Sequence, residues 1–143
     1  MISITAKPIT ARAATARGTI EFSNRDVAKQ IESMAIKKGD VLAIARVACI
    51  QAVKSTSQLI PLAHPIAITS VKCHLSVAEG HVDVEVTVES TGQTGVEMEA
   101  LTGVTGSLLS IYDMCKGMDR NMTMRDIRVI RKTGGQSGDF QFA

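Results

Sequence analysis

One long amphipathic helix is the feature of this sequence that most constrains its fold. Within the stretch Thr91–Lys116, large apolar residues recur at alternating spacings of three and four, which places them along one side of a helix. Such a helix is stable only when its apolar side is buried against another element, so we expect it to lie in the core. The residues on this side are Leu101, Val104, Leu108, Ile111 and Cys115.

Charged residues gather at the two ends of this predicted helix. Glu97 and Glu99 fall in its first turn, where unpaired backbone N–H groups favour a carboxylate. Asp113 and Lys116 can meet across one turn near the other end. Glu99 and Asp113 then lie roughly 21 Å apart along the helix. One small substrate cannot reach both ends within one chain, so a site that uses all of these groups needs a second subunit.

The clearest strand signal lies just before this helix. Apolar and polar residues alternate through Val71–Val77 and again through Val82–Val88, with a turn between the two runs. This pattern predicts an antiparallel hairpin with one apolar face. A further strand is predicted over Met124–Lys132, and the glycine-rich tail 133–143 is expected to be irregular.

Little regular structure is expected at the start of the chain. Alternation at Met1–Thr5 predicts a short edge strand that ends before Pro8. The segment Thr10–Gly18 has too few large apolar side chains to hold it firmly, so we expect a flexible arm over about residues 1–18. Ile20 and Phe22 alternate as a second short strand.

Two helices are expected between this strand and the hairpin. The first carries Val27, Ile31 and Met34 on one face and ends at Lys37-Lys38-Gly39, with glycine as the cap. Asp40 is placed to cap the second helix, which the pattern predicts over Val41–Ser57.

Together these elements predict a single α+β domain over residues 1–143. The order strand, helix, helix, strand, strand, helix, strand suggests an antiparallel sheet with helices packed on one face, plausibly of the ferredoxin-like type. A chain of 143 residues is long enough to bury a substantial core.

Composition argues against several classes of partner. Three Phe, one Tyr and no Trp leave few aromatic side chains on which bases could stack. A net charge of +2, with the basic residues scattered along the chain, argues against a nucleic acid or another polyanion. Neither a signal peptide nor a long apolar span is evident, so we expect no membrane association. Cys49, Cys73 and Cys115 are odd in number and far apart, which suits free thiols in the cytoplasm.

Taken singly, the candidate site residues are ambiguous. Lys38 either contacts an anion or is a solvated lysine at a helix end. His64 stands between Pro61 and Pro65 in a rigid loop, where a structural role and acid/base chemistry are about equally well supported. No metal is predicted, because Glu97 and Glu99 have no further ligand at a recognisable spacing.

Taken together, five blocks occur in an order that closely resembles the MoaC family, the cyclic pyranopterin monophosphate synthases of molybdenum cofactor biosynthesis. The resemblance covers nearly the whole chain. The blocks are Lys38-Gly39-Asp40-Val41, Leu59-Ile60-Pro61-Leu62-Ala63-His64-Pro65, Thr94-Gly95-Val96-Glu97-Met98-Glu99-Ala100-Leu101-Thr102, Ile111-Tyr112-Asp113-Met114-Cys115-Lys116 and Gly134-Gly135-Gln136-Ser137-Gly138-Asp139-Phe140.

The resemblance implies a lyase-type reaction in which 3′,8-cyclo-7,8-dihydro-GTP is rearranged to cyclic pyranopterin monophosphate and diphosphate is lost. It also implies a ferredoxin-like subunit and a homohexamer, a trimer of dimers with active sites at the dimer interface. No cofactor is required, while a divalent ion accompanying the triphosphate is left open.

Carried over by motif, the resemblance assigns roles to individual residues. Lys38 and Lys116 would be the general acid/base pair, and Asp113 would be the catalytic carboxylate. Arg12 and Lys132 would neutralise the triphosphate. The expected lining of the substrate pocket is Leu62, Ala63, His64, Glu97, Met98 and Glu99.

The chain departs from the family pattern at Ser3, Ala63 and Gln136, where an aspartate, a cysteine and a lysine are usual. None of these positions carries the proposed acid/base chemistry, although Gln136 weakens the expected share of the tail in phosphate binding. The rival reading is a non-catalytic oligomeric module that binds phosphorylated nucleotides through the same basic cleft.

Overall fold

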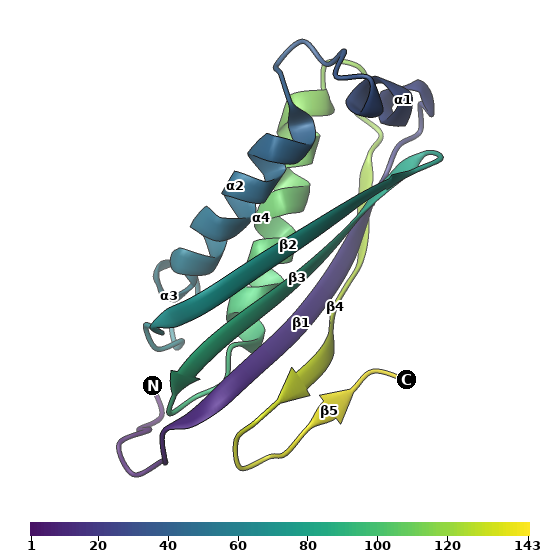
Figure 1. Ribbon diagram of the computed structural model, residues 1–143. Coiled ribbons are helices and arrows are strands. Elements are labelled where there is room, and N and C mark those ends of the chain that lie inside the picture. The colour runs from purple at the N-terminus through teal and green to yellow at the C-terminus, as the bar shows by residue number, and fades with distance from the viewer.

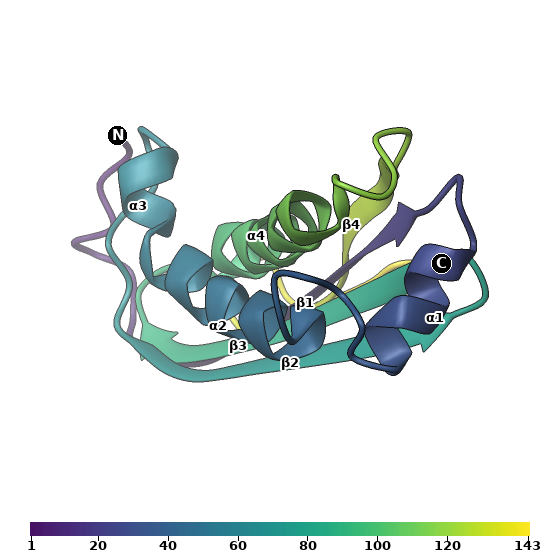
Figure 2. The same ribbon diagram turned by 90° about the horizontal axis from the view of Figure 1, so that it is seen from above.

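The computed structural model describes residues 1–143, which form one antiparallel sheet with its helices packed on one face (Figures 1 and 2). The strands lie in the order β2-β3-β1-β4-β5. The strands are β1 (Thr10–Glu21), β2 (Ile68–Ala78), β3 (His81–Gly92), β4 (Thr123–Thr133) and β5 (Phe140–Gln141), and the helices are α1 (Asp26–Glu32), α2 (Val41–Lys54), α3 (Thr56–Leu59) and α4 (Glu97–Cys115).

This topology confirms the predicted α+β, ferredoxin-like fold. The first strand β1 lies between β3 and β4, and β2 pairs with β3 at the far side. One helical connection joins β1 to β2, and α4 joins β3 to β4, so the two halves repeat a strand–helix–strand unit in one sheet. The predicted hairpin is β2 and β3, and the predicted strand at Met124–Lys132 lies within β4.

The predicted flexible arm is wrong over its second half, residues 10–18, which belong to a strand. β1 begins at Thr10 and is the central strand of the sheet, and no strand forms over Met1–Thr5. The small residues of β1 have a packing role, because a Cβ at Gly18 would lie 2.8 Å from a methyl carbon of Val104 on α4. The small side chains of β1 lower its local hydrophobicity, so the sequence pattern does not indicate a core strand. The same small side chains allow α4 to pack closely against it.

The apolar stripe of α4 lies in the core as predicted. Val104, Leu108, Ile111 and Cys115 are fully buried, and Leu101 is partly buried against them. Beneath them, the valines of β3 form the floor of the core, since residues that alternate along a strand share one face. These are Val82, Val84, Val86 and Val88, all fully buried.

The helices before the hairpin differ from their predicted bounds. α1 ends at Glu32, and Met34 lies beyond it at φ 58° with 61% of its surface exposed. Asp40 does cap α2, because its Oδ1 accepts a hydrogen bond from the Ala43 N–H at 3.1 Å. The helix predicted over Val41–Ser57 is two helices, α2 and the single turn α3.

The C-terminal tail is more ordered than expected. Its residues Phe140 and Gln141 form β5, which pairs with Lys132 and Arg131 at the edge of the sheet. None of the helices is long and apolar enough to cross a membrane.

Candidate active site

A cluster of two amines around one carboxylate lies at the C-terminal end of α4. Lys116 Nζ donates to Asp113 Oδ1 at 2.9 Å, one turn away on the same helix. Lys38 reaches the same carboxylate from the loop between α1 and α2, with Nζ 3.1 Å from Asp113 Oδ2. The structure therefore brings Lys38, Asp113 and Lys116 together, all about half exposed, and we call them the amine cluster.

Helix geometry explains why Lys38 is held there. The last carbonyl groups of a helix lack intrahelical partners and carry the negative end of the helix dipole. Lys38 Nζ donates at 3.1 Å to one of them, the main-chain oxygen of Asp113, as well as to the side chain. The amine thus caps α4 while it pairs with the carboxylate.

The two amines control the charge of the carboxylate. The hydrogen bond from Lys116 is the largest cause that lowers the pKa of Asp113, and the bond from Lys38 comes next. Asp113 therefore remains ionised at neutral pH and can accept hydrogen bonds from both amines. Such a cluster can donate a proton from nitrogen and restore it from a neighbour.

A basic hollow of about 300 Å³ lies at the opposite end of α4. Lys132 Nζ lies 3.5 Å from Glu97 Oε1 and also donates to the Ser137 hydroxyl. The N-terminal backbone of α4 opens beside it, and a helix N-terminus favours an anion. The lining of this basic hollow is Lys7, Arg12, Thr94, Gly95, Glu97, Lys132, Gln136 and Ser137.

The C-terminal glycines seat Arg12 in this hollow. Arg12 is only 9% exposed, and its Nε donates to the Gly92 carbonyl oxygen at 3.3 Å. A Cβ at Gly135 would overlap the Arg12 guanidinium, and one at Gly134 would overlap the Ala11 carbonyl oxygen. Both glycines have φ +87°, a backbone conformation that other residues rarely adopt. The tail can therefore wrap β1 only with glycine at these positions.

The remaining predicted residues lie toward the same end of α4 as the basic hollow, but none of them lines it. Glu99 is 4% exposed, and burial raises the pKa of its carboxyl, with a smaller contribution from the charge of Glu97. Met98 is exposed on the first turn of α4. Leu62, Ala63 and His64 lie in the loop after α3; Leu62 is exposed, His64 is half-buried, and none of the three borders the hollow.

The sequence interpretation missed Lys7. Its backbone is held beside the basic hollow because Gln93 Nε2 donates to the carbonyl oxygens of Thr5 and Lys7 at 3.3 and 3.2 Å. The only signal in the sequence was a positive charge ahead of Pro8, which does not by itself indicate a site. Gln136, noted as a departure from the family pattern, does line the hollow.

One chain thus holds the candidate residues in two separate groups, the amine cluster and the basic hollow, which we call the half-sites. Glu97 and Asp113 are sixteen positions apart on α4, which corresponds to roughly 24 Å. The amine cluster and the basic hollow therefore cannot contact the same small molecule within one chain. No group of three or more His, Cys, Asp or Glu side chains is arranged to hold a metal ion.

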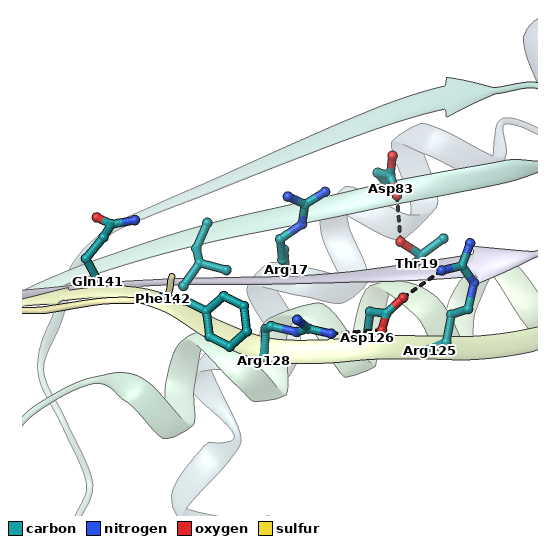
Figure 3. Close-up of a pocket in the computed structure, with 9 residues that line it drawn as sticks. Arg17, Thr19, Asp83, Arg125, Asp126, Arg128, Gln141 and Phe142 are labelled. Carbon is teal, nitrogen blue, oxygen red and sulfur yellow. Dashed lines mark hydrogen bonds and ion pairs between the residues drawn. The ribbon is translucent and has the colours of Figure 1, made fainter.

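A further hollow, of about 560 Å³, is separate from both half-sites (Figure 3). Its residues on β1, Arg17 and Thr19, alternate with Gly18, which contacts α4, so the hollow lies on the face of the sheet away from the helices. Asp126 accepts hydrogen bonds from both Arg125 and Arg128 there, at 2.6 and 2.8 Å. None of the predicted site residues lines this hollow.

Comparison with known proteins decides the family. The model of the MoaC family matches residues 1–135 of the chain. The chain belongs to the MoaC family.

Other MoaC-like sequences extend the match over nearly the full chain. A protein of Heliobacterium modesticaldum named cyclic pyranopterin monophosphate synthase is 50% identical over 142 residues, which cover 98% of this chain and 89% of that protein. Proteins of the same name from Parvibaculum lavamentivorans and Clostridium botulinum are 50% and 51% identical, covering 99% and 98% of this chain and 89% of each relative. A de novo designed protein with a ferredoxin fold aligns with this MoaC chain at a TM-score of 0.43 and 14% identity, over 82% of the chain and 83% of the design.

Proposed function

We propose that this chain is a cyclic pyranopterin monophosphate synthase, a lyase that converts 3′,8-cyclo-7,8-dihydro-GTP into cyclic pyranopterin monophosphate and releases diphosphate. The observation that carries the proposal is the amine cluster of Lys38, Asp113 and Lys116 in a chain of the MoaC family. Two amines bound to one carboxylate suit a reaction that must protonate and deprotonate ring atoms in sequence.

In this proposal the lysines move protons and Asp113 orients them. Lys38 and Lys116 act as the general acid/base pair while rings open and reclose. Asp113 bonds both amines at once, so each stays oriented and a proton lost from one nitrogen leaves a cation nearby. The half-exposed amines are accessible to a substrate that approaches the end of α4.

The basic hollow is proposed to bind the triphosphate. When the ribose 3′ oxygen attacks the inner phosphorus, negative charge accumulates on the departing diphosphate, and nearby cations stabilise it. Arg12, Lys132 and Lys7 supply positive charge there, together with the N-terminal end of α4. Glu97 now balances Lys132, and bound phosphate would compete for that contact.

The residues around the hollow are proposed to hold the ring system. Burial raises the pKa of the Glu99 carboxyl, and in this proposal that carboxyl contacts the ring system by hydrogen bonding. Met98 and the loop residues Leu62, Ala63 and His64 complete this pocket. We propose no resident metal or redox cofactor; a divalent ion that enters with the triphosphate would be part of the substrate.

The half-sites are proposed to meet between subunits. Two chains whose α4 helices run in opposite directions would place the amine cluster of one beside the basic hollow of the other, so a two-fold dimer would hold two complete sites. We propose that three such dimers form a homohexamer in the cytoplasm. Light scattering during size-exclusion chromatography measures this mass directly.

Turnover of the proposed substrate tests the function. Purified protein given 3′,8-cyclo-7,8-dihydro-GTP should release diphosphate and form the pterin product. Lys116→Ala should reduce turnover by at least about a hundredfold while substrate affinity changes little, because proton transfer is lost and the phosphate contacts remain. Lys72→Ala, which removes an exposed lysine of β2, serves as the matched control. Binding without turnover by the wild-type protein would favour the non-catalytic module instead.

The phosphate subsite is tested by binding. Arg12→Ala and Lys132→Ala should each weaken substrate affinity about tenfold or more, because a hydrogen bond to a charged group contributes about 1.5–3 kcal/mol. Arg131→Ala removes the same charge from the adjacent position of β4 and should bind normally, since Arg131 does not line the basic hollow. Calorimetric affinities equal to the wild-type value in both test variants would refute this assignment.

A further inference from the structure

A buried carboxylate outside the amine cluster joins two loops at the same end of α4. Asp119 follows α4 in the loop to β4 and is only 5% exposed. Its Oδ2 accepts from the main-chain N–H groups of Ser23 and Asn24, at 2.7 and 3.0 Å. Its Oδ1 accepts from the Ser23 hydroxyl at 2.6 Å and from the Asn121 N–H at 2.9 Å. All four partner groups donate hydrogen bonds. Only an ionised carboxylate can accept from all four, because neither of its oxygens carries a proton.

These bonds fix the starting point of the segment that carries Lys38. Asn24 also bonds to the first residues of α1, because its side-chain oxygen accepts from the Asp26 N–H at 3.0 Å and its carbonyl oxygen from the Val27 N–H at 3.2 Å. Val27 and Ile31 of α1 are then buried in the core. The entry to α1 therefore cannot shift relative to Asp119 without breaking hydrogen bonds to it.

One further buried residue lies between α1 and Lys38. Ile36, two residues before Lys38, is 6% exposed, and its carbonyl oxygen accepts from the Gly39 N–H at 3.0 Å. Lys38 thus lies in a turn that begins at the buried Ile36, and its amine bonds to Asp113. On the other side, Asp119 is bonded to the end of α4 through its own N–H, 3.2 Å from the Cys115 carbonyl oxygen.

We propose that Asp119 is a positioning residue for the amine cluster, holding the segment 23–38 against the end of α4 so that Lys38 meets Asp113. This inference rests on the proposed function only for its consequence in turnover; the link from Asp119 to the geometry of Lys38 is independent of it. The observations behind it are the four hydrogen bonds to Asp119 and the burial of Val27, Ile31 and Ile36 along the segment.

Asp119→Asn is the direct test. An amide presents N–H groups to two of the four donors, so the loops should separate and Lys38 should lose its fixed contact with Asp113. Turnover should fall about tenfold or more while KM stays within about twofold, because small misplacements of a reacting group reduce the rate of the chemical step. The exposed Arg25–Glu79 ion pair holds the same loop from outside, so Glu79→Gln is the matched control and should leave turnover unchanged.

A titration separates positioning from general stability. In Asp119→Asn, carbon-13 NMR of the Asp113 carboxyl should show its pKa raised, by about as much as in Lys38→Ala. In the Lys38→Ala background, adding Asp119→Asn should move that pKa no further, because the effect acts through Lys38. The groups that face Asp113 are Lys38 and Lys116, and Lys116 is unchanged throughout.

Each outcome bears on the proposal. Folded Asp119→Asn protein with unchanged Asp113 titration and unchanged turnover would overturn it. If that variant does not fold, Ser23→Ala removes only the hydroxyl bond, and it should raise the Asp113 pKa partially; no change there would equally overturn it. If wild-type protein makes no pterin product, the proposed function fails, and the NMR titration still decides the role of Asp119.

Discussion

At the scale of single residues, the charge of Asp113 depends on two neighbours of unequal weight. The hydrogen bond from Lys116 is the larger cause of the lowered Asp113 pKa, and the bond from Lys38 is the smaller. A carboxyl whose pKa is lower in the folded state than in the unfolded state stabilises the fold at pH values above its ordinary pKa. That contribution is lost as the pH falls through the lowered folded-state pKa.

Lys116→Ala should therefore raise the Asp113 pKa toward its ordinary value of 3.8, and Lys38→Ala should raise it less. The measurement is a carbon-13 NMR titration of the Asp113 carboxyl in both variants. Lys37→Ala is the control, because Lys37 is the sequence neighbour of Lys38 and forms no ion pair with Asp113. A larger shift in Lys38→Ala than in Lys116→Ala would contradict the order of the two contacts.

The three cysteines differ in ways that the sequence pattern did not indicate. A hydrogen bond from Cys49, opposed by burial and aided by Ser107 and Arg46, lowers the pKa of Cys73 to about 7. The Cys73 sulfur lies 3.7 Å from the Ser107 hydroxyl oxygen. Burial, together with the charge of Asp119, raises the pKa of Cys115 to about 11. Cys49 is fully buried, and its pKa is raised by the bond to Cys73 and by burial.

Iodoacetamide at neutral pH should consequently modify Cys73 at least about tenfold faster than Cys115, because the thiolate is the reactive form. Peptide mass spectrometry of briefly treated protein measures the order of labelling. Cys73→Ser should remove the fast phase, whereas Cys115→Ser should leave it intact. Equal rates at the two residues in folded protein would show that the thiol environments are not as described.

At the scale of elements, close packing of α4 on β1 depends on the absence of a side chain at Gly18. A Cβ there would meet side-chain carbons of Val104, Ile127 and Leu108 at 2.8, 3.0 and 3.1 Å. Two of these residues belong to α4, which packs on one face of the sheet, and Ile127 belongs to the neighbouring strand β4. The contacts are tighter than ordinary van der Waals separation, so the helix must move to admit a methyl group.

Gly18→Ala should destabilise the fold by about 1–3 kcal/mol, the usual cost of overfilling a packed core. Chemical denaturation of the variant and the wild-type protein measures the free energy of unfolding. Gly92→Ala is the matched control, because a Cβ at that position of β3 has no heavy atom within 4 Å. Loss of stability in the control but not in Gly18→Ala would mean that glycine flexibility, rather than helix packing, decides the cost.

At the scale of the whole molecule, the two half-sites lie at opposite ends of one rigid helix. Lys38 and Asp113 contact each other within one chain, so variants of these two residues cannot complement each other. A useful pair takes one variant from each half-site. Asp113→Asn removes the amine cluster's carboxylate, and Arg12→Ala weakens the basic hollow.

The two variants are unfolded and refolded together and assayed at a substrate concentration far below the weakened affinity of Arg12→Ala. The mixture should then recover about one quarter of wild-type activity. Half of the dimers then contain one copy of each variant, and in each of them one site of two receives both intact halves. Refolding each variant alone is the control and should recover about a tenth of wild-type activity or less. Confirmed mixed assembly without recovered activity would place the complete site within a single chain.

The sequence by itself determined the elements whose evidence is local. The apolar stripe of α4, the alternation of β2 and β3, and the Asp40 cap all follow from spacing along the chain, because helix and strand periods are properties of neighbouring residues. The ordered motif blocks likewise predicted the family, which the family model confirms. That a second subunit completes the site follows from the length of α4 and stays a prediction.

Only the tertiary structure decided which segments become neighbours. β1 was misjudged because alanine and glycine lower local hydrophobicity, yet the strand is central because α4 can approach it closely. Lys38 meets Asp113 across 75 positions, and Asp119 meets Ser23 across 96. These contacts depend on strand order and loop packing, which bring residues distant in sequence together. The spacing of apolar residues along the chain does not indicate them.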